Sequence, residues 1–116
     1  MSPRRAAQQW AVVLPDGTTE PVDAPLLLGR DPSADRGPVG ARLVTIHDPD
    51  GMVSRSHVVI EASAGRLMVH DVSSTNGLVL LYPDGTEVDV LDGAVAEIVS
   101  PCEIELGALA ISVRRV

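Results

Sequence analysis

The chain has 116 residues, which is enough for one hydrophobic core and too few for two. It carries 16 acidic and nine basic residues, so its formal net charge is −7 at pH 7. All nine bases are arginine, and Trp10 and Tyr82 are the only aromatic residues. An acidic chain with so few aromatic rings does not suit nucleic-acid binding, and a chain without lysine cannot perform Schiff-base or P-loop chemistry.

Cysteine content and hydropathy favour a cytoplasmic chain. Cys102 is the only cysteine, so no disulfide forms within the chain and a reducing compartment is expected. The apolar stretch at 10–14 is shorter than the apolar region of a secretory signal, and no run approaches the ~20 residues of a membrane span. We therefore expect no membrane insertion by this segment. The expected organisation is a flexible N-terminal segment at 1–9 and one folded domain at 10–116, which leaves open that the domain is part of a larger protein.

Short apolar runs separated by turn residues follow one another along the chain. Several runs alternate between polar and apolar residues, as the Glu-Ile-Glu-Leu run at 103–106 does. This period of two is typical of strands with one buried face. The pattern predicts eleven strands, at residues 10–14, 19–22, 26–29, 43–46, 57–61, 66–70, 77–82, 87–90, 94–99, 103–106 and 109–113.

Turn signals support an all-β fold. The sequence Pro-Asp-Gly-Thr occurs at 15–18 and again at 83–86, and each copy predicts a hairpin tip. The best helical candidate, 86–100, is interrupted by glycine and is rich in valine and isoleucine. Without crossover helices, we expect antiparallel pairing in a two-sheet β-sandwich with the ligand loops at one end. The segment 31–42, in which glycine, proline, serine and aspartate prevail, predicts a long surface loop.

Three polar clusters interrupt the aliphatic pattern where predicted strands meet loops: Gly29-Arg30, Ser54-Arg55-Ser56-His57 and Ser73-Ser74-Thr75-Asn76-Gly77. The two arginines offer planar forks that hold anionic oxygens in pairs, and the serine, threonine and asparagine side chains add further donors. The glycines allow sharp turns or close backbone approach. A phosphate monoester, with a charge of about −1.5 to −2 and three acceptor oxygens, suits such a set.

At these separations the three clusters resemble the motifs of the forkhead-associated (FHA) domain family. Asp71, two residues before the third cluster, and the Glu-Ile-Glu-Leu-Gly sequence at 103–107 also resemble the family pattern. The resemblance spans roughly residues 10 to 115. Two hairpins depart from it, because a second Asn-Gly is missing after Gly77 and Pro101-Cys102 stands where Gly-Asp is common.

The resemblance implies an eleven-stranded sandwich that binds phosphothreonine in partner proteins without catalysis and without a cofactor. The residues that it implies as phosphate contacts are Arg30, Ser54 and Thr75. Those that it implies as contacts of the peptide backbone are Arg55 and Asn76. Structural roles are implied for Gly29, His57, Asp71 and Gly77, with the histidine buried and bracing the loops. The expected partner is a phosphothreonine-containing substrate of a serine/threonine kinase.

Two other functions remain open. A phosphate-independent interaction domain would offer a basic partner its acidic residues, which equally suit a solvated face: Asp84, Glu87, Asp89, Asp92 and Glu97. A serine hydrolase would draw on Ser54, His57, His70 and Asp71, but the chain has no Gly-x-Ser-x-Gly elbow. The histidines and the cysteine lack the paired spacing of zinc ligands, so no metal is expected. The arginine-only, alanine- and valine-rich composition is typical of a GC-rich bacterial genome.

Overall fold

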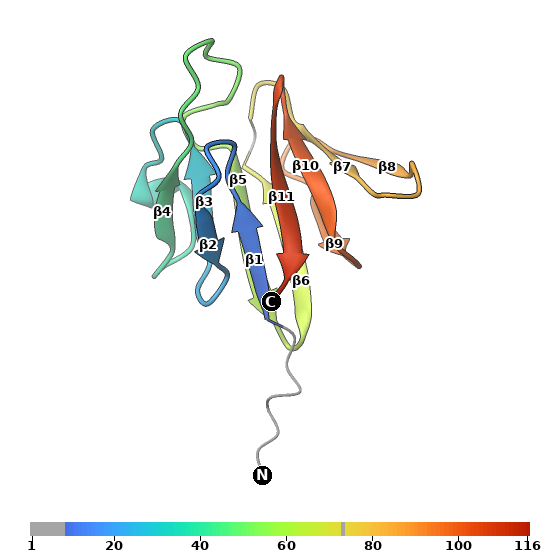
Figure 1. Ribbon diagram of the computed structural model, residues 1–116. Helices are drawn as coiled ribbons and strands as arrows, with labels where there is room; N and C mark the ends of the chain where they lie inside the picture. The colour runs from blue at the N-terminus through green and yellow to red at the C-terminus, as the bar shows by residue number, and fades with distance from the viewer. Residues whose placement is uncertain (1–8, 73) are drawn as a thin grey trace.

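The computed structural model describes residues 9–72 and 74–116 (Figure 1). They form one 3-10 helix, η2 (Ala34–Arg36), and eleven strands. In chain order the strands are β1 (Trp10–Val13), β2 (Thr19–Pro21), β3 (Leu26–Gly29), β4 (Arg42–Thr45), β5 (Val58–Ser63), β6 (Arg66–Asp71), β7 (Leu78–Leu81), β8 (Glu87–Val90), β9 (Val95–Ile98), β10 (Cys102–Leu106) and β11 (Leu109–Arg115).

All eleven predicted strands are confirmed, with ends shifted by no more than about two residues, as is usual for strand boundaries. The expected flexible segment 1–9 lies outside the described residues, apart from Gln9. No helix among the residues that the structure describes has the length and hydropathy needed to cross a membrane.

The strands form two sheets that enclose one aliphatic core. One sheet has the order β2-β1-β11-β10-β7-β8, and the other has the order β4-β3-β5-β6-β9. Side chains from both sheets, such as Leu28, Ile60, Leu80 and Ile104, are fully buried in this core. Trp10 joins the core as well, so apolar contact between the sheets holds the sandwich together.

Strand β10 shows how alternation positions its residues. Cys102 and Ile104 are buried, whereas Glu103 between them is exposed. Burial, with a smaller contribution from Glu103, raises the pKa of the Cys102 thiol to about 11. The cysteine is therefore an uncharged core side chain at neutral pH rather than a reactive thiolate.

One strand pair differs from the expected pairing. β3 and β4 are parallel, with Leu26 opposite Arg42, whereas every other pair of described strands is antiparallel as predicted. Parallel neighbours need a long crossover, and residues 30–41 supply it without an α-helix. This segment is the predicted surface loop, interrupted only by η2. Both strands therefore end at the same end of the sandwich.

The two Pro-Asp-Gly-Thr segments close the β1–β2 and β7–β8 hairpins, as predicted. In each, the aspartate Oδ1 accepts a hydrogen bond of 2.9 Å from the threonine N–H, from Thr18 to Asp16 and from Thr86 to Asp84. This backbone hydrogen bond favours the ionised carboxylate and lowers the pKa of both Asp16 and Asp84.

The loops that carry the three polar clusters lie at one end of the sandwich, and the chain ends lie at the other (Figure 1). The segments that follow β3, precede β5 and precede β7 gather at the upper end in this view. At the lower end, β1 pairs with β11, and the Val116 N–H donates to the Gln9 carbonyl at 2.9 Å. The three polar clusters of the sequence therefore meet at the end away from the chain ends.

The hairpin tips predict a pH dependence of stability. Because the native pKa of Asp16 and Asp84 lies below the ordinary 3.8, their contribution is complete above 3.8 and is lost as the pH falls through the native pKa. We expect a chain carrying both Asp16→Asn and Asp84→Asn to lose less stability than the wild type between about pH 5 and about pH 2.5. Urea unfolding midpoints at both pH values measure this, and equal losses in the two chains would contradict it.

Candidate functional site

The segment after β3 and the segment before β5 run side by side beyond the ends of these two paired strands. The N–H groups of Arg30 and Asp31 donate to the carbonyls of Ser54 and Arg55, each at 3.1 Å. A Cβ atom at Gly29 would lie 1.9 Å from the Arg55 carbonyl oxygen. Only glycine permits this approach, which brings the first polar cluster against the second.

The side chain of Arg30 is exposed and held at one point. Its Nε–H donates to the carbonyl of Val53 at 3.0 Å. A guanidinium has five N–H donors, so this bond leaves the fork formed by the two terminal nitrogens free to meet an anion. Orientation by a main-chain carbonyl also removes part of the entropy that a long side chain would otherwise lose on binding.

Ser54 connects all three clusters. Its carbonyl accepts the Arg30 N–H, its N–H donates to Nδ1 of His57 at 3.0 Å, and its Oγ accepts the Thr75 N–H at 3.1 Å. The Ser54 hydroxyl hydrogen remains available as a donor, since Oγ acts only as an acceptor in these bonds. The structure thus brings together Arg30, Ser54 and Thr75, the three residues expected to contact phosphate.

His57 lies in the interior and bridges the second and third clusters. Its imidazole is fully buried. Because Nδ1 accepts the Ser54 N–H, the proton resides on Nε2, which donates to the Gly77 carbonyl at 2.7 Å. Both ring nitrogens are therefore satisfied by main-chain groups, and the ring sets the distance between the two loops.

Hydrogen bonds of Ser74 and of the buried Asp71 shape the third cluster. The Ser74 hydroxyl donates to Oδ1 of the buried Asp71 and accepts the Gly77 N–H at 2.9 Å, while Asp71 Oδ2 accepts the Gly93 N–H at 3.3 Å. Gly77 has a φ of +66°, and a Cβ there would lie 2.1 Å from a methyl group of Leu91. The left-handed backbone conformation therefore favours glycine at position 77, and any side chain there would also have to displace the Leu91 methyl group.

The two residues expected to hold a peptide backbone flank this centre. Asn76 is exposed, and its amide nitrogen donates to the Met52 carbonyl at 2.9 Å, which leaves Oδ1 as an acceptor. Arg55 is also exposed and lines a cavity of about 400 Å³ together with Arg36. Ser73, the first residue of the third cluster, lies outside the described residues.

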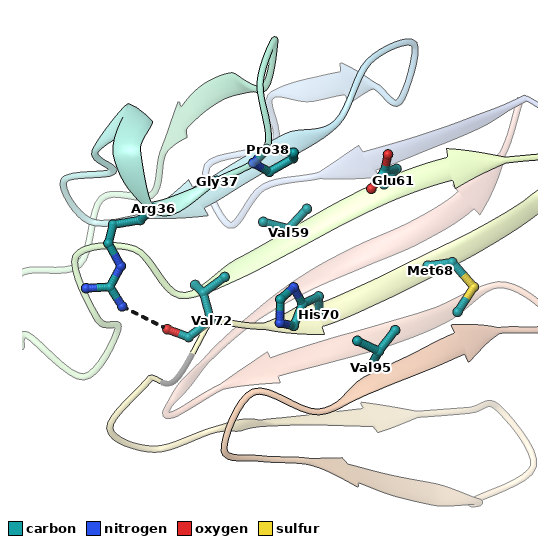
Figure 2. A pocket seen from close by; sticks show the side chains of 9 residues that line it. All are labelled: Arg36, Gly37, Pro38, Val59, Glu61, Met68, His70, Val72 and Val95. Carbon is teal, nitrogen blue, oxygen red and sulfur yellow. Dashed lines mark hydrogen bonds between the residues drawn. The ribbon is translucent and has the colours of Figure 1, made fainter.

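Sequence reasoning missed the contacts that the long 31–42 loop makes with the site. The Ser56 hydroxyl accepts the Ser33 N–H at 3.1 Å, and Nη2 of Arg36 donates to the Val72 carbonyl at 3.2 Å (Figure 2). Ser56 occupies the variable position within the second cluster, and neither Ser33 nor Arg36 belongs to a motif. Nothing in the residue pattern therefore pointed to them.

The arrangement needed for a serine hydrolase is not assembled. His57 has both ring nitrogens bound to main-chain groups, and the Asp71 carboxylate is bound by Ser74 and Gly93 rather than by a histidine. His70 lines a groove of about 390 Å³ on the outer face of the five-stranded sheet (Figure 2). In the part of the chain that the structure describes, no group of three or more histidine, cysteine, aspartate or glutamate side chains is placed to hold a metal ion.

Structural comparison finds 28 matching chains among solved structures. The FHA-1 domain of Mycobacterium tuberculosis Rv1747 matches with a TM-score of 0.60 and 20% identity over 94% of this chain and 97% of that one. A domain from work on phosphothreonine-dependent FHA domain interactions matches with a TM-score of 0.62 and 24% identity over 91% and 95%. Mycobacterium tuberculosis EmbR, solved with a low-affinity phosphopeptide, matches with a TM-score of 0.62 and 17% identity over 93% of this chain and 24% of EmbR. At these identities the likeness shows the fold.

No curated protein sequence matches the chain. The sequence pattern of the FHA domain matches residues 26–107, which is most of the chain and includes all three polar clusters. FHA domains are phosphopeptide-recognition modules and not enzymes. By this match and by its eleven-stranded sandwich, the chain belongs to the FHA domain family.

Proposed function

We propose that this FHA domain binds phosphothreonine in partner proteins and acts as a non-catalytic adaptor. The observation that carries the proposal is the position of Ser54, whose main-chain and side-chain atoms bond to both Arg30 and Thr75. These bonds hold the main chains of three segments that are far apart in the sequence close together, so the side chains of Arg30, Ser54 and Thr75 start from one small region.

The chemistry of these donors fits a phosphate monoester. The terminal nitrogens of Arg30 supply a charged fork, and the hydroxyls of Ser54 and Thr75 supply neutral donors. A phosphate presents three acceptor oxygens and about −1.5 to −2 charge, so each donor has an oxygen to bind. In the proposed complex these three residues contact the phosphate.

Arg55 and Asn76 complete the proposed site. The free Oδ1 of Asn76 is an acceptor for a peptide N–H, and the exposed guanidinium of Arg55 is a donor for a peptide carbonyl. Threonine is favoured over serine if its extra methyl group meets an apolar surface, which contributes about 0.8 kcal/mol. Because phosphothreonine is made by ATP-dependent kinases, the proposed partner is a kinase substrate and the proposed location is the cytoplasm.

The central test is calorimetric titration with three matched peptides that carry threonine, phosphoserine or phosphothreonine at one position. We expect binding to follow the order phosphothreonine, phosphoserine, threonine, with the last undetectable. Equal binding of all three peptides would identify a phosphate-independent interaction domain instead. No binding of any peptide from a degenerate phosphothreonine library, even at millimolar concentration, would refute the proposal.

Arg30→Ala is expected to weaken phosphothreonine-peptide binding by about 10- to 100-fold, because a charge-assisted pair is lost. The thermal midpoint should stay within about 2 °C of the wild type, since the side chain is exposed. Arg114→Ala removes the same charge from an exposed position near the end of β11 and should leave binding unchanged. Loss of folding in Arg30→Ala, or equal weakening in both variants, would show that Arg30 is not a ligand.

His57→Ala is expected to act on stability. It leaves the Ser54 N–H and the Gly77 carbonyl without partners in the interior and opens a cavity, at a cost of roughly 3 kcal/mol. Urea unfolding measures this change, and His47→Ala, at an exposed histidine, is the control that should cost almost nothing. A His57→Ala chain of wild-type stability would contradict the bracing role.

Phosphopeptide affinity should fall as the pH drops through about 6, where the phosphate gains its second proton. It should also fall with added salt, because charge-assisted contacts at a surface loop are screened. Titrations at about pH 5 and about pH 7.5, at two salt concentrations, measure both effects. Affinity that is independent of both variables would argue against recognition of a dianion.

A further inference from the structure

A second concave region lies at the end of the sandwich away from the three polar clusters. Two cavities of about 550 and 520 Å³ share Tyr82 and Pro83 in their lining, and we call this region the Tyr82 cleft. Strand β7 begins next to Gly77 and ends next to Tyr82, so about 17 Å of extended chain separates the cleft from the candidate phosphate site. The two regions share no lining residue.

The floor of the Tyr82 cleft is apolar and open. Leu81, Val88 and Val113 line it, and so does Val99, of which 64% is exposed. The Tyr82 hydroxyl accepts the Val99 N–H at 3.3 Å and so fixes the turn before β10 against the β7–β8 hairpin. An exposed apolar surface held in place in this way is typical of a binding site.

The cleft lies between two free sheet edges. β8 is the last strand of the six-stranded sheet and β9 is the last strand of the five-stranded sheet. Val88 from β8 and Glu97 from β9 line the same cavity. Each edge strand pairs on one side only among the described strands, so each offers a row of N–H and C=O groups that an extended segment can bind.

The negative charge of the cleft favours a binding partner with positively charged side chains. Its lining contains the carboxylates Asp84, Glu97 and Glu103, and no arginine or histidine. Glu97 forms an exposed ion pair with Arg66 at 3.6 Å, whereas Asp84 and Glu103 have no ion-pair partner among the described residues. Asp84 is ionised at neutral pH, as an aspartate ordinarily is, and its turn hydrogen bond lowers its pKa further. An apolar floor with an acidic rim complements alternating apolar and basic side chains.

We propose that the Tyr82 cleft binds an extended segment of a second protein in which apolar residues alternate with arginine or lysine. The segment pairs its backbone with an edge strand, places alternate side chains on the floor around Tyr82, and directs its cations to Asp84 and Glu103. Successive side chains of an extended segment point in opposite directions, so one segment can contact both the apolar floor and the acidic rim of the cleft. The domain then holds two partners at opposite ends.

The test uses the complete 116-residue chain, labelled with nitrogen-15, and a synthetic peptide of alternating valine and arginine as the probe. We expect amide shifts in residues 81–88 and 95–103 and none around Ser54 and Thr75. The same shifts should appear with the Arg30→Ala chain, which makes this result independent of phosphopeptide binding. Absence of shifts at millimolar peptide, or shifts spread over all acidic surfaces, would overturn the proposal.

The chain offers a matched control for the charges. Asp16 sits in an identical Pro-Asp-Gly-Thr turn with the same hydrogen bond as Asp84, but it lies outside the cleft. The double variant Asp84→Asn, Glu103→Gln should weaken binding of the valine–arginine peptide by roughly three- to tenfold. The double variant Asp16→Asn, Glu61→Gln removes one aspartate and one glutamate charge outside the cleft and should leave binding of the valine–arginine peptide unchanged. Equal weakening in the two variants would show a general electrostatic attraction and refute the cleft.

Peptides of alternating valine with threonine or glutamate complete the experiment. Both should bind more weakly than the arginine peptide. If the threonine peptide binds as tightly, the acidic rim has no role and the proposed partner class is wrong. If the unliganded chain shows the same shifts on concentration, the cleft binds a second copy of the chain, which also overturns the proposal.

Discussion

A single buried imidazole sets the geometry on which the candidate site depends. His57 bonds to the N–H of Ser54 on one side and to the carbonyl of Gly77 on the other. Both partners are main-chain groups, so the ring fixes the positions of two loops whatever side chains those loops carry. A buried polar ring is stable only when both nitrogens are satisfied, and the two loops must therefore keep this separation. The direct bond from the Thr75 N–H to Ser54 Oγ joins the same two loops and so depends on the separation that the ring maintains.

The strands were predictable from sequence because each follows a local rule. Alternation places Ile104 inside and Glu103 outside, and the repeated turn sequence closes two hairpins. The parallel pairing of β3 with β4 was not predictable, because it depends on where the long 31–42 loop returns to the sheet. Pairing of strands distant in sequence reflects the whole fold and leaves little trace in either strand.

The candidate site also has one part that could be predicted from the sequence and one part that could not. The motifs identified Arg30, Ser54 and Thr75, and the structure joins these three residues by hydrogen bonds from the N–H groups of Arg30 and Thr75 to Ser54. The sequence did not reveal how the side chains of Arg30 and Asn76 are oriented, because the carbonyls of Val53 and Met52 hold them. Every residue has a carbonyl, so such contacts have no residue signature. They depend on how the folded chain brings the segments at 29–31, 52–55 and 74–77 together.

The pairing of β1 with β11 has a consequence for how the domain is joined to other chains. Gln9 and Val116 are hydrogen-bonded neighbours, so the polypeptide enters and leaves the sandwich at nearly the same point. The backbone is thus almost a closed ring. Such a unit can be inserted into a loop of a host protein while disturbing that loop little, as domain insertions at adjacent ends do. By the same geometry, a short linker between the ends and a cut at the Pro83–Thr86 turn would give a permuted chain with every strand pair intact.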